Sequence, residues 1–166
     1  MSQLLCFTLN GEPVEVLVKA NSTLLEVLRD KLSVMSPKCG CNHGDCGACT
    51  VILDGKAVKS CLILALTIKG RNVLTVEGLN TGGELHPIQK AFIELGAPQC
   101  GHCTPGMVMT AKAFLDQNPY PTYKEIKEAL SGNLCRCTGY VKYVDAVMEA
   151  SKGTFGSLQK GSESNV

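Results

Sequence analysis

The sequence contains no tryptophan, and all aromatic residues together make up only 5% of its 166 residues. So few aromatic side chains argue against a platform on which nucleic-acid bases stack. Neither sign of charge is in excess, because 16 Lys and Arg stand against 15 Asp and Glu, a formal net charge of +1. Binding to nucleic acid or to an anionic membrane draws on a basic surface. We therefore expect neither kind of partner.

Long hydrophobic runs are also missing. The longest apolar run spans residues 61–66, whereas a membrane-spanning helix needs roughly 20 apolar residues. The first residues, MSQLLCFTLNGEPVEV, lack the basic and apolar regions of a signal peptide. We expect no membrane insertion and a cytoplasmic location. The apolar fraction of 45% is enough for a packed core.

Cysteine, in contrast, is abundant. Without a secretion signal, a framework of disulfides is not the default interpretation of many cysteines, and metal ligation or redox chemistry becomes the leading one. The ten cysteines are Cys6, Cys39, Cys41, Cys46, Cys49, Cys61, Cys100, Cys103, Cys135 and Cys137. Cys6 falls on an expected strand, where we predict a small buried apolar side chain.

The first half of the sequence has an α+β pattern. Asn10-Gly11 and Asp54-Gly55 are typical of two-residue hairpin turns. Thr23 and Glu26 form a capping box that predicts a helix with an apolar side of leucines, ended by Pro37. The expected strands cover residues 4–9, 14–18, 50–53, 56–60 and 73–76.

The second half has helical spacing throughout and predicts a small bundle. Pro105 is suited to the first turn of a helix, and Thr122 with Glu125 forms another capping box. The expected helices cover residues 87–95, 105–117, 122–130 and 141–151. We place Met107, Val108 and Met109 in the bundle core. The predicted organisation is a domain at 1–79, a helical domain at 80–153 and a mobile tail at 154–166.

The first cysteine set has the spacing C-x4-C-x2-C with a distant fourth member: Cys41, Cys46, Cys49 and Cys61. This is the spacing of plant-type [2Fe-2S] ferredoxins. Gly40, Gly44 and Gly47 permit the left-handed backbone angles that wrapping a cluster needs.

Other interpretations of the first set remain open. Cys46-Gly47-Ala48-Cys49 alone could be a dithiol redox pair, and four thiolates could also bind zinc. Cys39 could replace Cys41 as a ligand, although the C-x4-C register favours Cys41. Because four cysteines are present in each set, His43 and His102 are not required as ligands, and we expect loop positions for both.

The second set pairs C-x2-C with C-x-C after 31 residues: Cys100, Cys103, Cys135 and Cys137. Each pair precedes an expected helix, whose N-terminus favours thiolates. The spacing is less specific than that of the first set. A second cluster, a zinc site and two local disulfides all stay open on spacing alone.

Three longer strings carry a resemblance to a known family: GCNHGDCGACTV, QCGHCTPGM and GNLCRCTGY. Residues 3–152 resemble the iron–sulfur subunit of the molybdenum hydroxylases, the family of xanthine dehydrogenase, aldehyde oxidoreductase and carbon monoxide dehydrogenase. The resemblance implies a ferredoxin-like β-grasp domain followed by a four-helix bundle domain, each with one [2Fe-2S] cluster.

The resemblance also implies the role of individual residues. The N-terminal cluster would be held by Cys41, Cys46, Cys49 and Cys61, and the C-terminal cluster by Cys100, Cys103, Cys135 and Cys137. Gln99 and Cys137 would approach the molybdopterin of a partner. The chain itself has no catalytic residue under this interpretation.

The implied partners are a large molybdopterin-binding subunit, with or without a cytosine dinucleotide on the cofactor, and a medium FAD-binding subunit. Together they would form a heterotrimer, single or dimerised. Electrons would pass from molybdopterin through the C-terminal and then the N-terminal cluster to FAD. The substrate favoured by analogy is a purine or another N-heterocycle.

Several alternatives remain at this point. Related subunits serve enzymes for carbon monoxide, aldehydes and hydroxybenzoyl-CoA. A free two-cluster ferredoxin and a zinc-stabilised interaction module belong to other functional classes. A free carrier is expected to show a charged docking face, and this near-neutral sequence has no block of like charges.

Overall fold

The computed structural model describes residues 2–80, 82–137 and 139–156. The first half forms a five-stranded mixed sheet in the order β2-β1-β5-β3-β4. Among the strand pairs of the described residues, β1 and β5 are parallel and the other pairs are antiparallel. The strands are β1 (Ser2–Leu9), β2 (Glu12–Lys19), β3 (Thr50–Leu53), β4 (Lys56–Lys59) and β5 (Asn72–Leu74).

Both predicted hairpin turns are confirmed. Asn10 and Gly11 have φ angles of 53° and 89°, and Asp54 and Gly55 have φ angles of 47° and 77°. These left-handed values match the right-handed twist of the flanking strands. The two hairpins are β1–β2 and β3–β4.

The helix predicted after Thr23 begins as expected but ends early. Thr23 and Glu26 make the capping box at the start of α1 (Leu24–Glu26), which continues into a π-helical turn at Val27–Lys31. The prediction that Pro37 ends the helix is wrong, because Ser33 already has a left-handed φ of 57°. The Arg29 guanidinium donates to the carbonyl oxygens of Met35 and Pro37. These bonds fold the following segment back over the helix end.

The core of the sheet half lies between α1 and the sheet. Leu5, Phe7, Leu28, Val51 and Ile68 belong to this buried cluster. The prediction that Cys6 is a buried apolar side chain is wrong. Cys6 alternates away from this core, is only partly buried, and lies opposite Glu15 in the strand register, with its thiol 3.7 Å from the Glu15 carboxylate.

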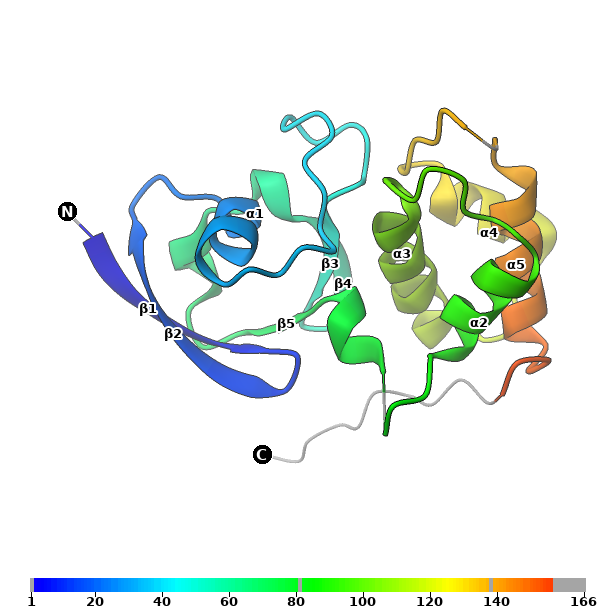
Figure 1. Ribbon diagram of the computed structural model, residues 1–166, viewed down its shortest axis with the longest axis horizontal. Coiled ribbons are helices and arrows are strands. Elements are labelled where there is room, and N and C mark those ends of the chain that lie inside the picture. Colours follow the sequence, from blue (N-terminus) through cyan, green and yellow to red (C-terminus); the bar gives the residue numbers. More distant parts are fainter. Residues whose placement is uncertain (1, 81, 138, 157–166) are drawn as a thin grey trace.

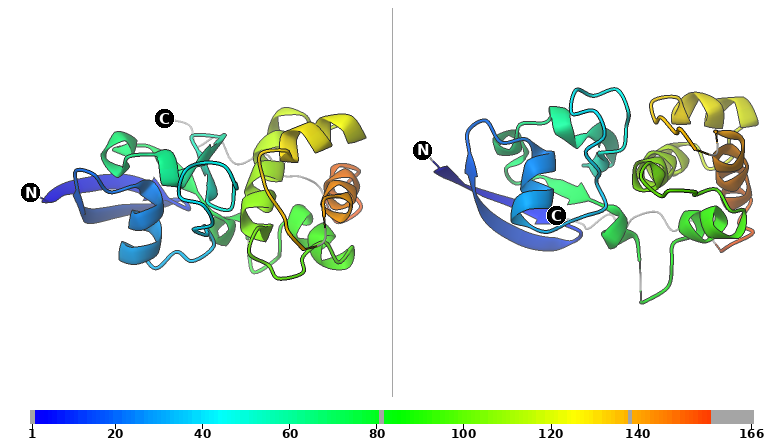
Figure 2. Two further views of the ribbon diagram at one scale, coloured as in Figure 1. Left: turned by 90° about the horizontal axis from the view of Figure 1, so that it is seen from above. Right: turned by 45° about the horizontal axis from the view of Figure 1, so that its top comes forward.

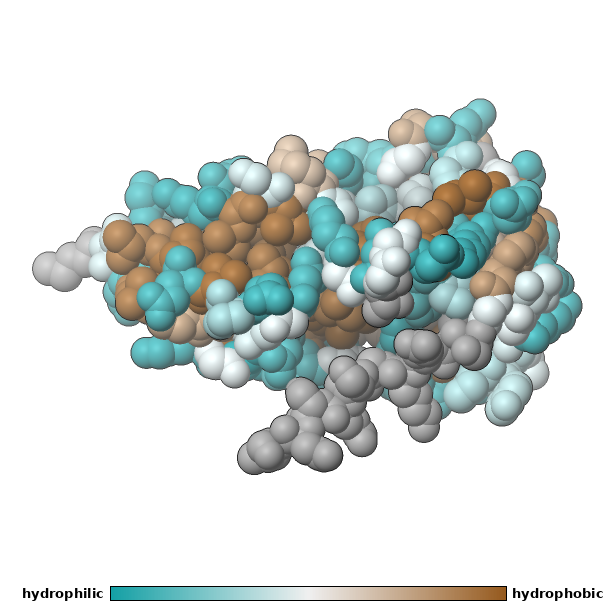
Figure 3. Space-filling view, turned by 60° about the horizontal axis from the view of Figure 1, so that its bottom comes forward, coloured by the Kyte–Doolittle hydropathy of each residue, from teal (hydrophilic) through white to brown (hydrophobic). Residues whose placement is uncertain are grey.

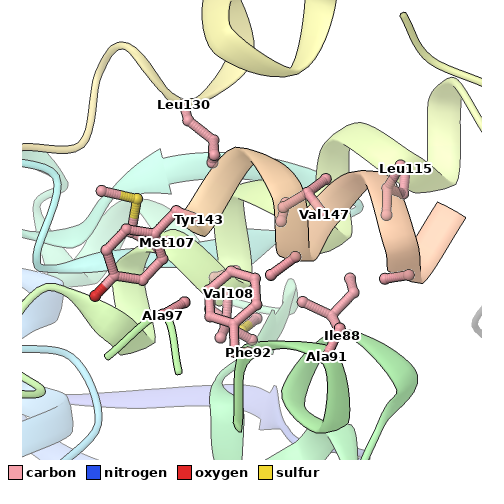
Figure 4. Packing of buried hydrophobic residues seen from close by; sticks show 14 of the residues in the cluster. Ile88, Ala91, Phe92, Ala97, Met107, Val108, Leu115, Leu130, Tyr143 and Val147 are labelled. Carbon is pink, nitrogen blue, oxygen red and sulfur yellow. The ribbon is translucent and has the colours of Figure 1, made fainter. Parts of the chain in front are cut away.

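The second half is helical, as predicted. The helices are α2 (Pro87–Glu94), α3 (Thr104–Gln117), α4 (Tyr123–Leu130) and α5 (Val141–Ser151). Their facing sides form a single buried cluster (Figure 4). Phe92 and Tyr143 pack edge to face with ring centroids 5.4 Å apart. Met107, Val108 and Met109 are all buried here, which confirms their predicted place in the core.

The sheet half and the helical half lie side by side, with α3 next to β3 (Figures 1 and 2). Ile52 of β3 belongs to the buried cluster of the helices. The mixed sheet and the helices of the second half are therefore in direct contact. The predicted tail lies outside the described residues from position 157 onward, and Phe155 packs against the helical cluster.

Within the part of the chain that the structure describes, every helix is too short or too polar to cross a bilayer.

His86 gives the fold a testable dependence on pH. Its Nδ1 accepts the backbone N–H of Ile88 and so caps α2. Burial lowers the pKa of His86 to about 4, and the positive charge of Lys112 acts in the same direction, while Asp116 opposes it. The unfolded chain therefore binds a proton near pH 6.5 that the folded chain does not. The stabilisation from neutral His86 is complete above pH 6.5 and is lost as pH falls toward 4.

We expect the free energy of unfolding to fall by about 1–2 kcal/mol across that window, after a discount because His86 is only partly buried. His86→Asn keeps a capping side chain but removes the titration. Denaturant unfolding at pH 7 and pH 4.5 checks this. A loss of equal size in the wild type and in His86→Asn would contradict the assignment to His86.

Candidate metal centres

The first cysteine set is brought together by a loop and a hairpin. Residues 38–49 form an irregular loop between the end of α1 and β3. Cys49 directly precedes β3, and Cys61 lies in the 3-10 turn Ser60–Leu62 that follows β4. The hairpin register pairs Thr50 with Lys59. The Ser60 hydroxyl donates to the Cys49 carbonyl at 2.7 Å. The hairpin therefore places the distant fourth cysteine beside the loop.

The four thiols of this set form two pairs. The Cys41 thiol interacts with that of Cys46, and the Cys49 thiol interacts with that of Cys61. Two thiols on each side suit a [2Fe-2S] rhomb, in which each iron takes two of the four thiolates. Cys49 and Cys61 are buried, and Cys41 and Cys46 are partly exposed.

Backbone N–H groups already favour a thiolate at the loop. The Cys46 N–H donates to the Cys41 sulfur at 3.4 Å. This bond, and a second from the His43 N–H, lower the pKa of Cys41 to about 6. Burial, followed by the neighbouring Cys49 thiol, raises the pKa of Cys61 to about 11. A bound metal would displace the proton of Cys61, because thiols ligate as thiolates.

At two glycine positions near this set, a side chain would be too close to a neighbouring residue. A Cβ at Gly40 would lie 2.7 Å from the Cys46 sulfur. Gly44 has a φ of +92°, and a Cβ there would lie 2.5 Å from the side chain of Leu62. The prediction of a left-handed angle is therefore wrong for Gly40, where the need for glycine is steric, whereas at Gly44 it is both steric and conformational. His43 pairs with Asp45 at 2.9 Å on the exposed side of the loop, as expected for a loop residue.

The second set lies where two helices begin. Gln99 and Cys100 are exposed in the loop before α3, and Cys103 is the buried N-cap residue that directly precedes the helix. Cys135 and Cys137 lie in the loop between α4 and α5. The thiols again pair, Cys100 with Cys137 and Cys103 with Cys135.

Burial divides the second set into an inner and an outer pair. Burial raises the pKa of Cys103 to about 11, and its thiol lies 3.4 Å from the hydroxyl of Tyr143. The His102 backbone N–H, followed by the Cys137 thiol, lowers the pKa of Cys100. Cys100 and Cys137 are exposed. The outer pair is therefore open to a partner, whereas the inner pair faces the protein.

The structure brings the two sets together across the contact between the halves. The Leu134 N–H, one residue before Cys135, donates to the Cys46 carbonyl at 2.9 Å. The Asn133 side chain donates to the Gly47 carbonyl at 3.0 Å. A Cβ at Gly40 of the first loop would lie 3.5 Å from Nε2 of His102 of the second.

Sequence reasoning missed the residues that join the two sets. Asn133 and Leu134 belong to the string GNLCRC, but nothing in the spacing assigns them a role. Gly106, where a Cβ would meet the Gly47 backbone and the Asn133 amide, was given no role either. Their contacts depend on the packing of α3 and of the segment before Cys135 against the first loop, which a cysteine pattern does not report. Cys39 is exposed and lies outside the four thiol pairs described above.

Comparisons with known proteins first define the class. Residues 7–73 match the family described as "2Fe-2S iron-sulfur cluster binding domain", and residues 75–148 match the family described as "[2Fe-2S] binding domain". The two matches cover the two cysteine sets in turn. The chain is thus a protein with two [2Fe-2S]-binding domains.

Individual relatives then define the family. The chain is 49% identical to the "Nicotinate dehydrogenase small FeS subunit" of Eubacterium barkeri, over 86% of this chain and 90% of the relative. It is 51% identical to the "Nicotine 6-hydroxylase small subunit" of Paenarthrobacter nicotinovorans, over 85% of each chain. Quinoline 2-oxidoreductase of Pseudomonas putida 86 shares the fold with a TM-score of 0.89 and 40% identity, over 92% of this chain and 95% of that one.

The chain belongs to the iron–sulfur subunits of the molybdenum hydroxylases. It is therefore an electron-transfer component of an oxidoreductase and carries two [2Fe-2S] clusters. The alternatives of a zinc module and of local disulfides in the helical half are not supported.

Proposed function

We propose that this chain conducts electrons from a molybdopterin centre in one partner to FAD in another. The N-terminal cluster would be held by Cys41, Cys46, Cys49 and Cys61, and the C-terminal cluster by Cys100, Cys103, Cys135 and Cys137. Each cluster supplies one-electron reduction and oxidation. The single observation that carries the proposal is the hydrogen bond from the Leu134 N–H to the Cys46 carbonyl. It joins a residue adjacent to one cysteine set to a member of the other.

The exposure of the outer pair, Cys100 and Cys137, indicates where electrons would enter the chain. Gln99, Cys100 and Cys137 are all exposed, so they can meet a partner's cofactor, and we assign Gln99 and Cys137 to the molybdopterin side. Cys135 is bonded to Leu134, and the Leu134 N–H donates to the Cys46 carbonyl of the first set. We assign the exit of electrons toward FAD to the first loop. Leu62, whose side chain lies next to Gly44 of that loop, is 60% exposed.

We further propose the finer organisation expected from the family. The sheet with α1 would be the ferredoxin-like β-grasp domain, at 1–79, and α2 to α5 would be the four-helix bundle domain, at 80–153. Separate buried clusters in the sheet half and in the helical half support this division.

Two partner subunits need two surfaces. Leu134, Tyr140 and Val141 are exposed beside the second set, and exposed apolar groups of this kind mark interfaces. Leu4 and Leu17 lie opposite each other in the register of β1 and β2 and are 52% and 61% exposed. Apolar surface spreads over the sheet half in Figure 3. We propose a heterotrimer with a large molybdopterin-binding and a medium FAD-binding subunit in the cytoplasm.

The proposed substrate is an aromatic N-heterocycle. The three relatives described above are named for nicotinate, nicotine or quinoline, and all three compounds contain a pyridine ring. The substrate would bind to the large subunit, since this chain supplies electron transfer only.

Purification of the native complex through a tag on this chain tests the proposal. We expect two further subunits, molybdenum and FAD. Anaerobic addition of nicotinate, nicotine or quinoline should then reduce both clusters and bleach the flavin. Isolation of the chain alone with both clusters would indicate a free ferredoxin instead. Reduction by an aldehyde or carbon monoxide, with none by the heterocycles, would overturn the substrate assignment alone.

A further inference from the structure

Asn133 is a buried polar side chain at the contact between the two halves. It is only 3% exposed. Its amide nitrogen donates to the Gly47 carbonyl at 3.0 Å, and its amide oxygen accepts from the Thr110 hydroxyl at 2.9 Å. Its own backbone N–H donates to the Leu130 carbonyl at 3.0 Å. Both ends of the amide are therefore engaged, as a fixed buried polar group requires.

Asn133 and its neighbour hold two consecutive carbonyl groups of the first cysteine loop. The Asn133 side chain binds the carbonyl of Gly47, and the Leu134 N–H binds the carbonyl of Cys46. Leu134 is followed directly by Cys135. The two bonds share one short segment, so a shift of Asn133 would move the Leu134 N–H away from its acceptor.

We propose that Asn133 is a positioning residue for electron transfer between the two cysteine sets. It clamps the first loop against the second and so maintains the hydrogen-bonded path from Cys135 through Leu134 to Cys46. The inference rests on the proposed relay and adds the residue that sets its efficiency. Transfer moves one electron and breaks no bond: the C-terminal centre is oxidised by one electron and the N-terminal centre is reduced by one.

Thr110 determines which way the amide faces. Its hydroxyl can donate to the amide oxygen, and this places the amide nitrogen toward the Gly47 carbonyl. An aspartate at 133 would keep the shape and the acceptor for Thr110. It would present a second acceptor to the Gly47 carbonyl, which gives repulsion in place of a hydrogen bond.

Asn133→Asp tests the clamp in the full chain loaded with its clusters. Thr110→Val removes only the donor that orients the amide, and Thr110→Ser is the matched control because it keeps the hydroxyl. Three properties are measured. Hydrogen exchange follows the backbone of residues 130–137, EPR of the reduced chain reports the magnetic interaction between centres, and rapid photoreduction gives the rate at which they equilibrate.

We expect Asn133→Asp to speed exchange at Leu134, weaken the magnetic interaction and slow equilibration several-fold, because the two cysteine sets would lie further apart and lose their hydrogen-bonded contact. Thr110→Val should show the same three changes to a smaller extent, and Thr110→Ser should match the wild type. Thr110→Val also serves as the test if Asn133→Asp does not fold.

Failure of this inference differs from failure of the relay itself. Wild-type rates and exchange in both Asn133→Asp and Thr110→Val, with four irons per chain retained, would overturn the role of Asn133 and leave the relay standing. A wild-type chain whose two centres do not exchange electrons would overturn the relay.

Discussion

Replacement of Gly106 by alanine is expected to destabilise the chain and to separate the two cysteine loops. Alanine is the better helix former by roughly 1 kcal/mol, so local propensity predicts a gain within α3. A Cβ at Gly106, however, would overlap the backbone carbonyl oxygen of Gly47 and crowd the Asn133 amide. Backbone atoms cannot rotate out of the way as a side chain can. The helix must therefore move away from the first loop.

We expect Gly106→Ala to lower the free energy of unfolding by about 1–3 kcal/mol, the usual cost of overpacking a tight contact. Thermal unfolding of the loaded chain measures this. Gly132→Ala is the matched control, because its Cβ would meet nothing closer than the Lys59 ammonium at 3.9 Å. That control should stay within about 0.5 kcal/mol of the wild type. Equal stability of the two variants would show that the contact between α3 and the loop is not as close as described.

Replacement of Cys137 by serine is expected to remove the C-terminal cluster and leave the N-terminal one. Cys137 is exposed and pairs with Cys100, so its loss should cost little in packing. Serine is a much weaker iron ligand than a thiolate, because its hydroxyl is far less acidic than a thiol, and the count should fall from about four irons to about two. In the complex, reduction of FAD by substrate should stop.

Cys39→Ser is the control for this variant. Cys39 is an exposed thiol of the first loop, two residues from Cys41, and is not among the proposed ligands. About four irons per chain should remain. Loss of two irons in Cys39→Ser, with Cys41→Ser unaffected, would mean that Cys39 is the ligand. Reduction of FAD at the normal rate in Cys137→Ser would refute the relay.

Much of the secondary structure could be predicted because local chemistry determines it. Asn10-Gly11 adopts the turn that its backbone preferences favour, and Thr122 with Glu125 starts α4 as a capping box. The end of the helix after Thr23 could not be predicted in the same way. It depends on the Arg29 side chain, which binds carbonyls six and eight residues further along the chain.

The candidate cysteine sites likewise combine local features, which the sequence indicates, with long-range contacts, which it does not. The C-x4-C-x2-C spacing reflects a single loop, so the sequence alone is enough to predict a grouping of the cysteines. The position of Cys61 follows from the β3–β4 register, which its hairpin turn also indicates. Asn133 and Gly106 were not recognised, because their partner Gly47 is far away in sequence and comes close only when α3 packs on β3. Long-range packing of this kind leaves no periodic pattern.

The most direct test of the account is the content of iron and acid-labile sulfide per chain, measured together with EPR after dithionite reduction. The account predicts about four irons and four sulfides, no zinc, and two distinct reduced signals, one for each cysteine set. About two irons with a single signal would contradict the assignment of the second set. Zinc without sulfide would contradict electron transfer by this chain.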